Sequence, residues 1–151
     1  MTFVDAMLRL LLAAGLGAAL GLEREYRQKA AGLRTNMLIA LGAALFTEVS
    51  MTIAGPAGPS DRVAAQIVTG IGFLGAGAIL RGRNGVHGMT TAATIWVNAA
   101  IGMAAGSGLM AVAAAATAIT LVVLVMLPPI EGYFDRRAGL TEKTAEHRRN
   151  D

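Results

Sequence analysis

The residues of this chain that are able to do chemistry are few, and they lie within long apolar stretches. A dinucleotide-binding fingerprint is the first candidate, because Gly70, Gly72 and Gly75 have the spacing G-x-G-x-x-G. That motif needs a strand before it, a helix that opens at it and an acid about 20 residues later. Here the glycines lie inside an apolar run, and the following region offers Thr90 and Thr91 instead of an acid. The context therefore argues against a nucleotide site.

Two acidic residues, Glu48 and Asp61, are weak candidates for a metal site. Two carboxylates, completed by carbonyl groups and water, would suit Mg²⁺. No spacing motif supports the pair, and each residue has a simpler role: Asp61 as the N-cap of a helix, and Glu48 as an acid inside a membrane span. No other cofactor is indicated. The sequence has no cysteine, no Walker loop and no Ser/His/Asp set, so we predict no enzyme.

The elements that must position these residues are predicted to be membrane helices. Of 151 residues, 54% are hydrophobic and only 15% are charged, whereas soluble domains carry about 25% charged residues. The charges are clustered, and none falls between Gly88 and Ile130, which leaves room for two spans of about 20 residues each. The basic residues are explained if they set the orientation of a membrane protein in the bilayer. We therefore predict no nucleic-acid partner.

The fold class predicted is all-α, a polytopic membrane bundle of about five transmembrane helices. Residues 1–130 form the membrane domain, and residues 131–151 form a short charged tail. The expected spans are Phe3–Leu22, Thr35–Ile53, Asp61–Leu80, Met89–Ala105 and Leu109–Leu127, with Pro128-Pro129 ending the last. Between them we expect a loop at Gly55–Ser60 and a tight turn at Asn84-Gly85.

The distribution of basic residues predicts the orientation of the bundle. Five spans leave Arg9 and Arg62 on one side and place the other eleven Lys and Arg residues on the opposite side. Because Lys and Arg concentrate on the cytoplasmic side, the N-terminus is expected outside and the C-terminus in the cytoplasm. The expected location is the plasma membrane, crossed several times.

Glycines mark the faces where helices are expected to pack closely. Small residues let two backbones approach in lipid, where packing must hold helices together. The predicted positions are Gly17 and Gly21 in the first span and Gly70, Gly72, Gly75 and Gly77 in the third. These faces are compatible with a homodimer, although all of them could equally be used within one chain.

Polar side chains recur inside the predicted spans. Thr91, Thr94 and Asn98 are spaced i, i+3 and i+7 on one face of the fourth span, and Gln66 and Thr69 share a face of the third. Such groups either hydrogen-bond between helices or line a polar path. Both interpretations remain open from the sequence.

The connector after the first span is rich in charge. Glu23, Arg24 and Glu25 lie at its start and Arg34 at its end. One interpretation is a cluster that fixes helix packing or docks a partner protein. The other is a solvated surface with weak ion pairs, each worth about 0–1 kcal/mol.

Three blocks of the sequence together resemble the signature of the MgtC/SapB family. They are Gly21–Glu25 with Ala31–Asn36, then Asp61–Ile79, then Gly88–Trp96. Their order and spacing match as well, and the resemblance covers about Leu10 to Leu127. The family consists of bacterial inner-membrane proteins associated with growth in low magnesium and, in pathogens, with virulence.

The resemblance implies a regulator that modulates a partner membrane protein, such as an ATP synthase or a magnesium-transporting ATPase. The predicted cluster, partner-binding or structural, comprises Glu23, Arg24, Glu25, Arg34, Thr90 and Thr91. The resemblance supports it for Glu23, Arg24 and Arg34, and some members have Asn where Thr90 stands. The best-known members also carry a soluble C-terminal domain, so we expect this chain to be a short form that lacks it. The alternative function is a transporter or channel for Mg²⁺ or another cation, formed by self-association.

Overall fold

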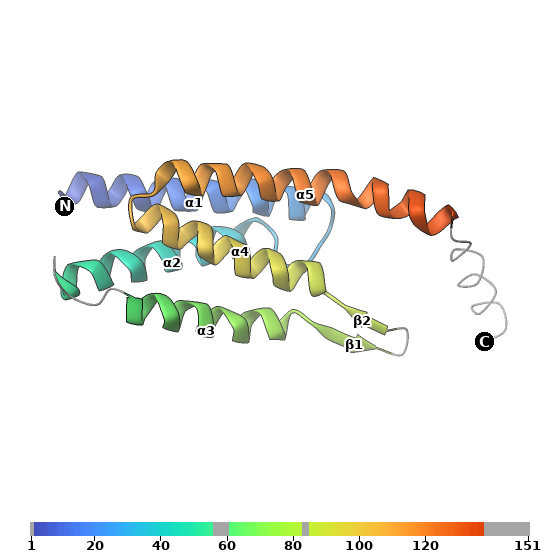
Figure 1. The fold of residues 1–151 in the computed structure, drawn as a ribbon, viewed down its shortest axis with the longest axis horizontal. Coiled ribbons are helices and arrows are strands. Elements are labelled where there is room, and N and C mark those ends of the chain that lie inside the picture. Colours follow the sequence, from blue (N-terminus) through green and yellow to red (C-terminus); the bar gives the residue numbers. More distant parts are fainter. Residues whose placement is uncertain (1, 56–60, 83–84, 138–151) are drawn as a thin grey trace. The chain divides into compact units, whose positions relative to one another are not determined.

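The structure, a computed structural model, describes residues 2–55, 61–82 and 85–137. It divides into two units, Met1–Thr120 and Leu121–Asp151, and each is described by itself. The described elements are helices α1 (Phe3–Tyr26), α2 (Leu33–Ala54), α3 (Asp61–Gly77), α4 (Met89–Gly106) and α5 (Met110–Arg137), and strands β1 (Leu80–Gly82) and β2 (Gly85–His87) (Figure 1). The predicted all-helical architecture of five helices is confirmed.

The first unit is a bundle in which α2 and α4 form the central pair. Helix α2 packs against α1, α4 and, less extensively, α3, while α4 also packs against α1 and α3. The α3–α4 connector, expected to be irregular, forms a small antiparallel hairpin in which Leu80 pairs with His87 and Arg81 with Val86. The main layers are therefore helix on helix, and the hairpin is the one departure from an all-α chain among the described residues.

Local signals in the sequence explain where two of these helices begin. Thr2 and Asp5 form a capping box, with the Asp5 N–H donating to Thr2 Oγ1 at 3.2 Å and the Thr2 N–H donating to Asp5 Oδ2 at 3.1 Å. Gly88 precedes α4 with a φ of 90°, a left-handed value that glycine adopts without steric cost. An added Cβ there would also collide with the carbonyl of Ala78, so the turn into α4 requires glycine.

Three of the described helices are long and apolar enough to cross a membrane: α1, α2 and the segment Met110–Phe134 of α5. Helix α3 has 17 residues and rises about 25 Å, which is less than the hydrocarbon thickness of about 30 Å. Helix α4 is similar in length, with 18 residues, and several polar side chains are buried on it. That α3 and α4 each cross the membrane completely stays a prediction, and so does the orientation of the two chain ends.

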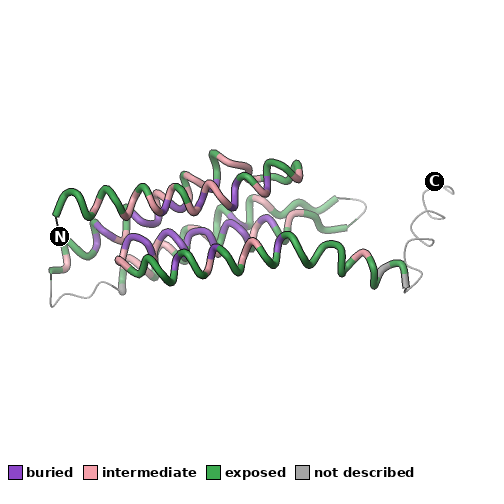
Figure 2. Tube along the Cα trace, turned by 90° about the horizontal axis from the view of Figure 1, so that it is seen from above, coloured by how far each residue is buried: buried purple, intermediate pink, exposed green. Residues whose placement is uncertain are grey.

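The first unit is apolar on its outside and partly polar inside, which is the arrangement expected in lipid. Large apolar side chains face outward, as in Phe3 (80% exposed) and Phe73 (82% exposed). The buried interior contains many alanines together with fully buried Asn36 and Asn98. Figure 2 shows the buried positions gathered along the inner sides of the helices. A water-soluble bundle would show the opposite distribution.

Glycines bring the backbones of α1, α2 and α4 into close contact. A Cβ added to Gly17 would lie 2.6 Å from the Asn36 carbonyl oxygen, and one added to Gly21 would lie 2.6 Å from Leu33 Cα. Both positions were predicted as packing glycines. Gly102 and Gly106 of α4 were not predicted, but they face α2 in the same way. A Cβ added to Gly102 would lie 2.9 Å from Ala40 Cα, and one added to Gly106 would lie 2.5 Å from the Ala44 carbonyl oxygen. These contacts leave no room for larger residues.

The glycines of α3 behave differently from the prediction. A Cβ added to Gly70, Gly72 or Gly77 would meet nothing within 4 Å in the described chain, and one on Gly75 would make only ordinary contact with Ala92 at 3.7 Å. Close packing at these positions is therefore not found among the described residues, and packing against a second chain stays a prediction. The reason is that α3 turns only one side toward α4 and presents most of its glycines outward.

Three predicted boundaries are wrong. The first span was expected to end at Leu22, but α1 continues to Tyr26 and includes Glu23, Arg24 and Glu25, which were expected in the connector. The third span was expected to reach Leu80, but α3 ends at Gly77 and Leu80 begins β1. The last span was expected to end at Pro128-Pro129, but α5 continues through both prolines to Arg137 and so includes the start of the predicted tail. Proline fixes φ near −65°, a helical value, so a helix can pass through it at the expense of a backbone hydrogen bond. The expected loop at residues 56–60 and residue 84 of the expected turn lie outside the described residues.

The second unit begins at Leu121 and, in its described part, consists of the remainder of α5. The rings of Tyr133 and Phe134 meet edge to face with centroids 5.9 Å apart. Arg136 Nε donates to the Gly132 carbonyl at 3.0 Å, one turn back along the helix. Nothing in the structure tests the predicted domain boundary at residue 130.

The close α2–α4 contact predicts that one added methyl group destabilises the bundle at Gly102 of α4 but not at Gly15 of α1. Gly102→Ala should destabilise the bundle by about 1–3 kcal/mol, because the added Cβ overlaps the Ala40 backbone. Gly15→Ala is the matched control, since an added Cβ there meets nothing within 4 Å and alanine favours the helix by up to about 1 kcal/mol. Thermal unfolding in detergent measures both, and equal melting temperatures would contradict the close contact.

Candidate functional site

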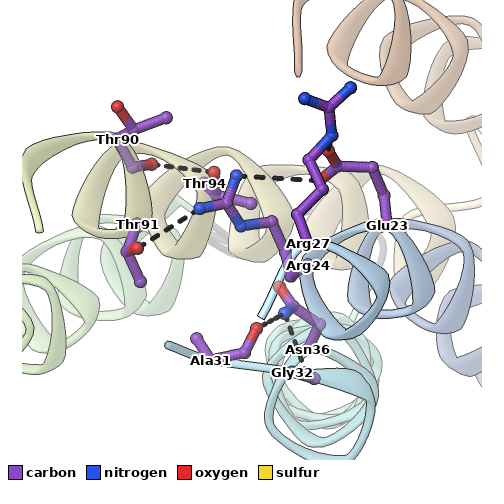
Figure 3. Close-up of polar contacts among 9 residues, drawn as sticks. All are labelled: Glu23, Arg24, Arg27, Ala31, Gly32, Asn36, Thr90, Thr91 and Thr94. Carbon is purple, nitrogen blue, oxygen red and sulfur yellow. Dashed lines mark hydrogen bonds and ion pairs between the residues drawn. The ribbon is translucent and has the colours of Figure 1, made fainter. Parts of the chain in front are cut away.

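An ionic cluster lies at the C-terminal end of α1, where the sequence predicted charged residues. Glu23 Oε1 is 2.7 Å from Arg27 Nε, and Glu23 Oε2 is 3.6 Å from Arg24 Nη1 (Figure 3). The side chains of Glu23 and Arg24 are 8% and 5% exposed. Among the described residues, neither Glu23 oxygen has a partner that meets the geometry of a hydrogen bond. Both oxygens are nevertheless close to a guanidinium, so the charge of Glu23 is compensated. Removing one partner of so buried a pair costs more than breaking a surface pair.

Arg24 connects this cluster on α1 to helix α4. Its Nη2 donates to Thr91 Oγ1 at 3.4 Å, and the Thr91 residue is 5% exposed. Figure 3 shows the guanidinium lying between Glu23 and Thr91. The neighbouring Thr94 is equally buried but donates to the Thr90 carbonyl at 2.8 Å within its own helix. Arg24 and Thr91 thus connect two helices, whereas the Thr94 hydroxyl bonds within one.

Two buried asparagines join α2 to α4 beside this cluster. Asn98 Nδ2 donates to the Asn36 backbone carbonyl at 2.7 Å and to Asn36 Oδ1 at 3.1 Å. Both residues are completely buried. Buried amides need partners, because an unsatisfied one costs about 1–3 kcal/mol. The pair therefore fixes the register of α4 against α2.

The same Asn36 also holds the connector between α1 and α2. Its Nδ2 donates to the carbonyls of Ala31 and Gly32, the latter at 3.0 Å. Gln28 and Ala31 have φ values of 52° and 57°, in the left-handed region that residues with a Cβ rarely adopt. From the other side, Glu25 Oε2 accepts from the Leu33 N–H at 3.0 Å and so caps α2. Side chains of both helices thereby stabilise a strained turn.

The predicted cluster divides into a buried and an exposed part. Glu23, Arg24 and Thr91 lie inside the bundle, while Glu25, Arg34 and Thr90 are exposed. Arg34 follows the connector at the start of α2, and Thr90 is in the first turn of α4, adjacent to Thr91. Only the exposed residues are accessible to another protein.

A second charged group lies near the other end of α1 and α2. Glu48 is 4% exposed, and its Oε1 has no hydrogen-bond partner among the described residues. Arg9 of α1 is close enough to attract it electrostatically, and Arg9 Nη1 donates to the Gly106 carbonyl at 3.1 Å. Glu48 of α2 and Arg9 of α1 thus lie close to the end of α4. Arg9 was not predicted to take part.

The other predicted polar residues form no metal site within the part of the chain that the structure describes. Asp61 is the first residue of α3, and its side chain lies outside the described residues, so its pairing with Glu48 in a metal site stays a prediction. Gln66 is exposed on α3. Among the described residues no three His, Cys, Asp or Glu side chains are grouped so as to hold a metal ion.

Comparison with known proteins identifies the family. The MgtC family profile matches residues 10–133. The chain belongs to the MgtC family. It is 50% identical over 115 residues to Protein MgtC of Brucella abortus, covering 76% of this chain and 48% of that protein. It is 53% identical over 121 residues to Protein MgtC of Salmonella typhimurium, covering 80% and 52%.

An uncharacterised protein of Synechocystis is 44% identical over 137 residues, which is 91% of this chain and 58% of that protein. The chain thus spans about half the length of the curated relatives it matches. No solved structure matches it. The predicted family is confirmed. The chain is a membrane protein, and three of its described helices are suited to crossing the bilayer.

Sequence reasoning missed several residues that the structure places in the MgtC-family bundle. Asn36 stood in one of the resembling blocks but was not assigned a role, and Arg9 was noted only for its charge. The available signal for Asn36 was its position at the start of a predicted apolar span, where an amide needs a partner. No sequence signal indicated that this partner would be Asn98.

The asparagine pair yields a stability prediction with an internal control. Asn98→Leu keeps the branched shape of the side chain but removes both hydrogen bonds to Asn36, so it should destabilise the bundle by about 1–3 kcal/mol. Thr94→Val removes a hydroxyl that bonds only within α4 and should cost less than about 1 kcal/mol. The melting temperatures of both variants in detergent check this, and a larger loss for Thr94→Val would overturn it.

Proposed function

We propose that this MgtC-family chain is a regulatory protein of the bacterial inner membrane that binds and modulates another membrane protein. An ATP synthase or a magnesium-transporting ATPase is the expected kind of partner, in adaptation to low magnesium or in virulence, as the family resemblance implies. The N-terminus would lie outside and the charged connectors on the cytoplasmic side. No enzymatic activity is proposed.

The division of the charged cluster is the observation that supports this proposal most directly. Its buried members, Glu23, Arg24 and Thr91, are paired within the chain and hold α1 on α4. Arg34 and Thr90 are exposed at the same end of the bundle. A buried, rigid cluster that presents exposed polar residues from two helices suits recognition of a protein surface.

The exposed residues predict where a partner binds. Tagged protein is purified from its own membranes in mild detergent at low and high Mg²⁺, and captured proteins are identified by mass spectrometry. Arg34→Glu should lower capture of the partner roughly tenfold, equivalent to about 1.4 kcal/mol, and Thr90→Ala should lower it less. The thermal stability of both variants should match the wild type, because both side chains are exposed.

Matched controls lie on α3, at exposed positions away from the cluster. Arg62→Glu repeats the charge reversal and Thr69→Ala repeats the loss of a hydroxyl; both should leave capture of the partner unchanged. Equal capture by all four variants would place the contact elsewhere on the protein. Absence of any stoichiometric partner at either Mg²⁺ level would contradict the regulator proposal.

Cation transport by a self-associated form is the second candidate, and Glu48 is the observation that favours it. The carboxylate of Glu48 is buried, and one of its oxygens has no hydrogen-bond partner within the described part of the chain. Such a group is a functional candidate when it lies in a membrane helix. A homodimer or larger assembly would have to complete the path.

Flux through the purified protein in liposomes separates the two candidates. If the protein is a regulator, we expect Mg²⁺ entry no faster than in empty liposomes. Flux that is lost in Glu48→Gln but kept in the exposed control Glu25→Gln would establish the transporter instead. The same preparation reports the oligomeric state by its size in detergent.

A further inference from the structure

An open groove runs between α2 and α3. Its apolar part has a volume of about 430 Å³ and is lined by residues such as Leu38, Phe46 and Leu74. A second hollow of about 480 Å³ lies at the end of the groove near Ser50 and Arg62. The two hollows share Val63 and Gln66 as lining residues, so they form one continuous groove with an apolar body and a polar mouth.

Glycines keep this groove open. Gly42 of α2 and Gly70 of α3 both line its apolar part, and a Cβ added to either would meet nothing within 4 Å. Helix α3 packs chiefly on α4 and only slightly on α2, so the seam between α2 and α3 is not closed by side chains. A groove of this kind holds an extended apolar group.

The mouth has the chemistry of an anion site. Arg62 is exposed there, beside the Gln66 amide and the Ser50 hydroxyl. A guanidinium binds phosphate oxygens with paired, charge-assisted hydrogen bonds. Arg62 is also one of only two basic residues expected on the outer side of the membrane, where the positive-inside rule gives it no orienting role. A helix from another chain could fill the apolar part but would not by itself supply an anion to Arg62.

We propose that the α2–α3 groove binds one molecule of an anionic phospholipid, with an acyl chain along the apolar part and the phosphate at Arg62. Gln66 and Ser50 donate to the headgroup. The bound lipid fills the seam that α3 leaves against α2 and so fastens α3 to the bundle. This role is independent of any partner protein.

Native mass spectrometry of the purified full chain with added phosphatidylglycerol tests the acyl part of the site. Gly70→Leu and Gly42→Leu each place a side chain in the groove. Each should reduce the lipid-bound fraction by roughly tenfold or more, because several methylene groups of the acyl chain are excluded from the groove. Gly72→Leu is the matched control: it also has open space at Cβ but does not line the groove. Its lipid binding should equal that of the wild type.

The headgroup is tested by comparing phosphatidylglycerol with phosphatidylcholine of the same chains. The wild type should prefer phosphatidylglycerol severalfold, and Arg62→Gln should remove the preference while the control Arg34→Gln keeps it. Helical content and elution volume show that each variant is folded. Equal lipid retention by Gly70→Leu, Gly42→Leu and Gly72→Leu would overturn the proposal. So would equal binding of both lipids, or a dimer that Gly70→Leu disrupts, since a second copy would then occupy the groove.

Discussion

The close approach of the α2 and α4 backbones is the constraint on which the bundle depends. In lipid the hydrophobic effect does not bring helices together, so packing and hydrogen bonds must do so. Gly102 and Gly106 allow contact with the backbone at Ala40 and Ala44. The short distance between the helices also places the Asn98 side chain within reach of the Asn36 backbone carbonyl. Larger residues at the two glycines would separate the helices and leave the Asn98 amide without its acceptors on Asn36.

Polar groups then determine how the helices are aligned along their lengths. The Asn98–Asn36 hydrogen bonds set α4 against α2, and the Arg24–Thr91 contact sets α1 against α4. Asn36 further stabilises the connector in which Ala31 adopts a left-handed conformation, a cost of order 1–3 kcal/mol. Because the helix faces are otherwise mostly alanine and glycine, few other contacts distinguish one alignment from another. The buried polar residues thus act mainly as determinants of specificity.

The sequence predicted the helices and the polar face of α4, because apolar runs and the spacing of Thr91, Thr94 and Asn98 are local patterns. It did not predict which glycines are in contact. Gly70 and Gly102 both lie in apolar helices, and only the three-dimensional arrangement shows that one faces open space and the other faces α2. The pairing of Asn36 with Asn98 depends on the same arrangement. The continuation of α5 through Pro128 was missed because proline usually ends a helix, although its fixed φ is compatible with one.

The unequal packing of the helices suggests how stability and binding are divided in the molecule. Helices α1, α2 and α4 are joined by glycine contacts and by the polar network, whereas α3 rests chiefly on α4 and leaves a groove toward α2. Elements with few contacts open at lower free energy than the core that supports them. Ligands that bind beside α3 therefore stabilise it at a cost in conformational entropy, while the exposed residues at the connector end remain on the rigid part. A regulator built in this way could respond to its membrane through α3 and present a constant surface to a protein partner.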